Sequence, residues 1–126
     1  MKFKTYDLDK LSETKLFDLD VVSRFFHTKQ KYFDALTDFE KFYKRDLSNY
    51  NPTFVTHCDS NREELIKECF EVRAALVRLG MNDLLDALNV LENAAITKHE
   101  KEFSDGQVKF RATVKIYKEA IKNSEM

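Results

Sequence analysis

Glycine and proline are scarce in this chain, and their scarcity restricts the possible folds more than any other feature. The 126 residues include two glycines and one proline. Sheet proteins use both residue types in hairpin turns and bulges, so a chain with so few of them is poorly suited to a β-sheet. A length of 126 residues is also that of one domain. We therefore expect a single all-α domain over residues 1–126.

Four segments have apolar residues spaced three and four apart, as one face of a helix requires. They span about residues 28–47, 61–79, 83–98 and 104–122. Their apolar stripes are Tyr32, Phe33, Leu36, Phe39, Tyr43 and Leu47 in the first segment, Leu65, Cys69, Val72, Leu76 and Leu79 in the second, Leu84, Leu85, Leu88, Leu91 and Ala95 in the third, and Phe110, Val114, Tyr117 and Ile121 in the fourth. Short connections favour antiparallel neighbours, so the pattern predicts an up-and-down four-helix bundle.

Capping residues and helix breakers predict where these helices begin and end. The expected caps are Ser60 or Asn61 for the second helix and Asn82 or Asp83 for the third, and the fourth helix should begin near Ser104 or Asp105. Pro52 and the turn formers before it should end the first helix, because proline cannot continue the hydrogen-bond ladder. Gly80 should end the second in a left-handed conformation.

The N-terminal residues, about 7–27, are expected to form short additional helices. Asp7 is a suitable cap for the first of them, and an apolar segment that contains Phe17, Phe25 and Phe26 follows. We expect this region to cover one end of the bundle, with Phe17 and either Phe25 or Phe26 in contact with it.

The balance of charge gives no reason to expect nucleic acid or a membrane surface as a partner, because 21 basic side chains face 22 acidic ones. No apolar run approaches the roughly 18 residues of a membrane span, and the N-terminus lacks the apolar stretch of a signal peptide. Cys69 falls on an apolar helical face, which favours a buried thiol over a disulfide with Cys58. These features predict a cytoplasmic protein.

Motifs of enzymes are missing from the sequence. It contains no glycine-rich phosphate loop, no cysteine pairs at metal-binding spacing and no Glu-x-x-His repeat. His27, His57 and His99 are scattered, and the pair His57-Cys58 is a weak metal signal that is better explained as two loop residues before a helix. We expect no enzymatic activity, no metal site and no cofactor.

The segment 61–79 is apolar over more than one face. Beside its core stripe lies a shoulder of Ile66, Phe70 and Val77, with Arg73 among them and Ala74 next to them. Either the helix is wedged between two neighbours and both faces are core, or the shoulder is a solvent-accessible docking patch.

Residues 69–80 resemble the signature helix of histidine-containing phosphotransfer (HPt) domains. Their sequence is Cys69-Phe70-Glu71-Val72-Arg73-Ala74-Ala75-Leu76-Val77-Arg78-Leu79-Gly80. The family pattern is a phosphorylatable histidine, then lysine and glycine three and four residues later, and a Leu-Gly pair that closes the helix. Leu91-Glu92 stands where the family carries a Leu-Glu pair in the following helix. The resemblance covers nearly the whole chain as topology, but its specific part is residues 69–92.

Three departures from this pattern determine the function that it implies. Phe70 occupies the phospho-histidine position and has no nitrogen to accept a phosphoryl group. Arg73 replaces the lysine and Ala74 the glycine. The resemblance therefore implies a pseudo-HPt protein that binds the receiver domain of a response regulator or hybrid kinase without accepting phosphate. Its docking residues would be Ile66, Phe70, Arg73, Ala74, Val77 and Arg78.

Two alternatives remain open at this point. One is a helical interaction or scaffold domain unrelated to phosphorelays, and the other is an active phosphotransfer protein that uses His57 or His99. The pseudo-HPt hypothesis requires Ile66, Phe70, Arg73 and Val77 on one open surface. The scaffold hypothesis predicts that Phe70 is core and that another patch is exposed.

Overall fold

The computed structural model describes residues 4–42 and 47–126, and the regular elements in these two ranges are seven helices. In chain order they are α1 (Leu8–Glu13), α2 (Leu19–Phe25), α3 (Lys29–Phe42), α4 (Pro52–His57), α5 (Asp59–Arg78), α6 (Asn82–Ile96) and α7 (Glu100–Asn123). The prediction of an all-α fold is confirmed. None of the helices described is long and apolar enough to cross a bilayer.

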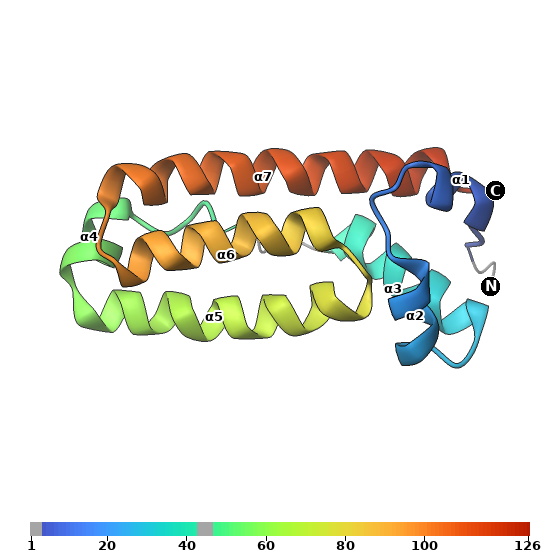
Figure 1. The fold of residues 1–126 in the computed structure, drawn as a ribbon, viewed down its shortest axis with the longest axis horizontal. Helices are drawn as coiled ribbons and strands as arrows, with labels where there is room; N and C mark the ends of the chain where they lie inside the picture. The colour runs from blue at the N-terminus through green and yellow to red at the C-terminus, as the bar shows by residue number, and fades with distance from the viewer. Residues whose placement is uncertain (1–3, 43–46) are drawn as a thin grey trace.

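Three long helices form the main body of the molecule (Figure 1). Helices α5, α6 and α7 have 20, 15 and 24 residues and run antiparallel, with α6 between the other two. Helix α4 closes one end and contacts all three, whereas α1 and α2 lie at the opposite end. Helix α3 contacts α7.

The predicted apolar stripes form the core. Of their members within the described ranges, Leu85 is partly buried and all the others are buried. Tyr43 lies outside the described residues. Removal of this apolar surface from water is the main force that holds the helices together.

The three long helices begin earlier than predicted, α5 at Asp59, α6 at Asn82 and α7 at Glu100. The residue before α5, α6 and α7 is Cys58, Met81 and His99 respectively, and none of the three provides a side-chain cap. The expected caps Ser60, Asn61, Asp83, Ser104 and Asp105 therefore lie inside the helices, and Asn82 is the first residue of α6. At the start of α6 a tertiary contact takes the place of the cap, because the backbone N–H of Asp83 donates to Tyr117 Oη of α7 at 3.2 Å.

Pro52 begins a helix, which corrects the prediction that it only ends one. Asn51 Oδ1 accepts hydrogen bonds from the backbone N–H groups of Thr53 (2.9 Å) and Phe54 (3.2 Å), and Pro52 follows at the first helical position. Proline suits that position because its missing N–H would be unpaired there anyway. Leu47, which was expected inside the first helix, has a left-handed φ of 60°.

The N-terminal cover has the expected form. Asp7 caps α1, and the segment that follows packs Phe17 edge-on against Tyr117, with ring centroids 5.3 Å apart. Phe26 is half-buried against the core, whereas Phe25 is exposed. Phe26 rather than Phe25 therefore joins Phe17 in the cover.

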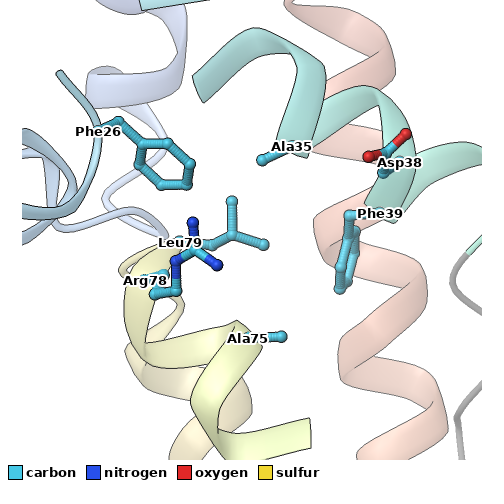
Figure 2. Close-up of a pocket in the computed structure, with 7 residues that line it drawn as sticks. All are labelled: Phe26, Ala35, Asp38, Phe39, Ala75, Arg78 and Leu79. Atoms are coloured by element: carbon cyan, nitrogen blue, oxygen red, sulfur yellow. The ribbon is translucent and has the colours of Figure 1, made fainter. Parts of the chain in front are cut away.

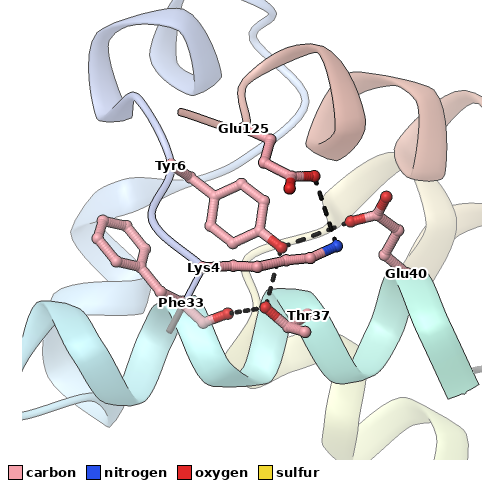
Figure 3. A network of polar contacts seen from close by, with 6 residues as sticks. All are labelled: Lys4, Tyr6, Phe33, Thr37, Glu40 and Glu125. Atoms are coloured by element: carbon pink, nitrogen blue, oxygen red, sulfur yellow. Dashed lines mark hydrogen bonds and ion pairs between the residues drawn. The ribbon is translucent and has the colours of Figure 1, made fainter. Parts of the chain in front are cut away.

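The two ends of the described chain are joined (Figure 3). The Asp7 N–H donates to the Ser124 carbonyl at 2.7 Å, and the Met126 N–H donates to the Thr5 carbonyl at 2.9 Å. Between them, buried Tyr6 places its hydroxyl 2.9 Å from Thr37 Oγ1 of α3. These contacts hold the N-terminal segment, α3 and the end of α7 as one unit.

Candidate functional site

Phe70 projects from α5 into solvent with 71% of its surface exposed. The core stripe of the same helix, by contrast, is buried. An exposed phenylalanine leaves a large apolar ring in water, which is characteristic of a contact surface when other apolar groups lie beside it. The wedged-helix explanation required the shoulder of α5 to be core, and at Phe70 it is not.

Ile66, Phe70, Arg73 and Val77 lie on one face of α5, because residues three and four apart are neighbours on a helix. Ile66 and Val77 are half-buried, and Ala74 beside them is exposed. We call Ile66, Phe70, Arg73, Ala74 and Val77 the Phe70 surface. The structure brings these five predicted docking residues together.

Arg73 is held by α6. Its Nη2 donates to Glu92 Oε1 at 2.8 Å and to Asn89 Oδ1 at 3.1 Å, and the ion pair is partly shielded from solvent. The resemblance to HPt domains includes both Arg73 and Glu92 but does not predict that they pair. The two residues lie on either side of the Gly80 turn, in helices that were expected to be antiparallel. That arrangement could have predicted the pair. The Arg73 charge is thus largely compensated within the protein.

Arg78 belongs to a different part of the molecule. Its guanidinium lies over the ring of Phe26, 5.2 Å from the centroid, on the side of α5 that faces α2 and α3 (Figure 2). Of the six predicted docking residues, five therefore form the Phe70 surface and Arg78 lies apart from them.

A pocket of about 280 Å³ opens beside Arg78. It is lined by Phe26, Ala35, Asp38, Phe39, Ala75, Arg78 and Leu79, which come from the end of α2, from α3 and from the end of α5. We call it the α3–α5 pocket. The sequence does not predict this pocket, because its walls come from three segments whose mutual packing is not visible in the sequence.

The cysteines and histidines of the described residues differ in their exposure to solvent. Burial raises the pKa of Cys69 to about 12, so this thiol stays protonated and is a poor nucleophile. His27, His57 and His99 are exposed, and no group of three potential metal ligands occurs among the described residues. His57 ends α4 and is not a loop residue, and both Cys58 and Cys69 are free thiols.

Comparisons with known proteins add no further assignment. No protein-family model, curated protein or solved structure matches the chain. The resemblance to HPt domains therefore rests on residues 69–92.

Proposed function

We propose that this chain is a pseudo-HPt protein of two-component signalling, which binds a receiver domain of a response regulator or hybrid kinase in the cytoplasm and accepts no phosphate. In this proposal α3, α5, α6 and α7 are the four helices of an HPt-like up-and-down bundle. The observation that carries the proposal is the 71% exposure of Phe70 at the position of the family's phosphorylatable histidine.

The Phe70 surface supports docking through apolar contact. Complete burial of the Phe70 side chain in an interface contributes about 2 kcal/mol. Ile66 and Val77 extend the apolar area, and the small Ala74 allows a partner backbone to approach closely. Single aromatic side chains of this kind supply much of the affinity in many protein interfaces.

Binding without transfer follows from the side chains present. Phenylalanine has no lone pair to attack a phosphoryl group. His57 and His99 lie at helix ends, and His99 Nδ1 is 2.7 Å from Thr97 Oγ1. The protein would then act as an adaptor or competitor, or as a reader of the phosphorylation state of the receiver. The scaffold alternative predicted a buried Phe70, and that prediction is wrong.

Titration calorimetry against purified receiver domains from the same organism, with and without a phosphoryl mimic, tests the proposal. We expect micromolar binding by the wild-type protein and at least tenfold weaker binding by Phe70→Glu, because a carboxylate would be buried in an apolar contact. Val108→Glu is the matched control, since Val108 is 57% exposed on α7 and outside the Phe70 surface.

Two results would contradict the proposal. The first is an absence of binding to every receiver in the panel. The second is an equal loss of affinity in Phe70→Glu and Val108→Glu, which would place the contact elsewhere. Capture of a helical partner but of no receiver would instead favour the scaffold alternative.

A further inference from the structure

The α3–α5 pocket has apolar walls and two charged side chains at its rim. Phe26, Phe39 and Leu79 supply the large apolar groups, and Ala35 and Ala75 point into the space from α3 and α5 (Figure 2). The volume of about 280 Å³ lies just below the range typical of small-molecule sites. A ligand of this size would have one ring or a short aliphatic chain.

Arg78 is oriented but its charge is not compensated. Its guanidinium is stacked on Phe26, and within the described ranges it forms no ion pair and donates no hydrogen bond. Stacking restricts the side chain without occupying its N–H groups, so the guanidinium remains able to bind a carboxylate through two parallel hydrogen bonds. It differs in this respect from Arg73, which Glu92 already neutralises.

Asp38 contributes a negative charge on the other side of the pocket, beside Phe39 (Figure 2). It forms no ion pair with Arg78, nor with any other side chain in the described part of the chain. Its carboxylate would repel a second negative group on a ligand. The two charges together favour a ligand with one anionic end, directed toward Arg78 and away from Asp38.

We propose that the α3–α5 pocket binds a small apolar monoanion, such as an aromatic monocarboxylate, whose carboxylate pairs with Arg78 and whose ring lies among Phe26, Phe39 and Leu79. Asp38 makes the site selective against dianions of the same size. The site is separate from the Phe70 surface and does not depend on the function proposed for that surface.

Titration of the isotope-labelled protein with 3-phenylpropionate, followed by NMR, tests this proposal. We expect saturable shifts confined to the pocket residues and a dissociation constant of about a millimolar or lower, as a ligand of this size allows. The neutral analogue 3-phenylpropionamide and the dianion phenylsuccinate should each bind about tenfold more weakly, because the first lacks the charge and the second meets Asp38.

Four variants separate the contributions. Arg78→Gln should weaken binding of 3-phenylpropionate about tenfold, and Asp38→Asn should restore binding of phenylsuccinate. Ala75→Leu fills the space and should abolish binding, whereas Ala112→Leu, the same change at an exposed position of α7, should leave it unchanged. Circular dichroism checks that each variant is folded.

The proposal is overturned if the amide binds as tightly as the carboxylate, if Arg78→Gln binds like the wild-type protein, or if the shifts map outside the pocket. An absence of shifts at ligand concentrations well above the millimolar range also overturns it.

Discussion

At the scale of single residues, Gly80 meets two requirements at once. It ends α5 with a left-handed φ of 63°, as the sequence predicted. The structure adds a second requirement, because the Asp18 N–H donates to the Gly80 carbonyl at 2.9 Å and brings the backbone of the N-terminal cover against the glycine. A Cβ at Gly80 would lie 2.5 Å from the Asp18 carbonyl oxygen, which is a steric clash.

Gly80→Ala should therefore lower the free energy of unfolding by more than the conformational penalty alone. A left-handed φ costs a residue with a Cβ about 1–2 kcal/mol, and the contact with Asp18 adds to this cost. We expect a loss of roughly 3 kcal/mol in urea denaturation.

Lys98→Gly measures the conformational contribution separately. Lys98 has a φ of 60° at an exposed position, so the glycine should stabilise the protein by about 1 kcal/mol. The free energy of unfolding that Gly80→Ala loses should exceed the free energy that Lys98→Gly gains. If it does not, the close contact with Asp18 adds nothing to the cost of the alanine.

At the scale of secondary-structure elements, α5 has a different neighbour on each of its sides. Its buried stripe packs into the core, its Phe70 surface is joined to α6 by Arg73 and Glu92, and its Arg78 side faces α2 and α3. One helix thus provides the residues of two separate sites, and a substitution in one is not expected to disturb the other.

The link between α5 and α6 can be measured with a double-mutant cycle of Arg73→Gln and Glu92→Gln. The side chains are 30% and 19% exposed, so solvent screens the pair only in part. We expect a coupling free energy of about 0.5–1 kcal/mol in urea denaturation, toward the upper end for partly exposed ion pairs. The coupling should decrease with added salt. A coupling of zero at low salt would show that Glu92 does not hold Arg73 in solution.

At the scale of the whole molecule, Tyr117 joins three segments that are distant in sequence. Its hydroxyl donates to the Leu16 carbonyl at 2.8 Å and accepts from the Asp83 N–H at 3.2 Å, while its ring packs on Phe17. Burial raises the pKa of Tyr117 to about 12, so the hydroxyl keeps its proton and can donate at neutral pH. The N-terminal cover, the start of α6 and α7 are therefore coupled through one side chain.

Tyr117→Phe should lower the free energy of unfolding by about 1–3 kcal/mol, because two backbone groups lose their partner while the ring is retained. Tyr32→Phe is the matched control. The Tyr32 hydroxyl is buried and has no hydrogen-bond partner among the residues that the structure describes, so its removal should be neutral or stabilising. Equal losses in the two variants would mean that the contacts of Tyr117 with Leu16 and Asp83 contribute nothing specific.

The sequence predicted the positions of the long helices better than their ends, and it did not predict the short helix α4 between α3 and α5. Leu65, Cys69, Val72 and Leu76 are buried as their spacing indicated, because helical periodicity is a local property of the chain. Helix α4 has only six residues, too few for a periodic stripe, and was missed. The predicted cap of α6 was wrong because Tyr117 of α7, which is distant in sequence, binds the first-turn N–H of Asp83.

The candidate site was predicted only in part. Ile66, Phe70, Arg73 and Val77 were placed on one face of one helix, and a single helix suffices to do so. Three further properties depend on which helices pack beside α5. They are the exposure of Phe70, the ion pair of Arg73 with Glu92 and the position of Arg78 in the wall of the α3–α5 pocket.

The sequence by itself determined that this protein is helical, which face of each long helix is buried and where α5 ends, because spacing, composition and a left-handed glycine act over a few residues. Only the tertiary structure decided which face of α5 remains open and which arginine is compensated. Those properties depend on the packing of segments far apart in the chain, and Leu16 and Tyr117 meet across 101 positions.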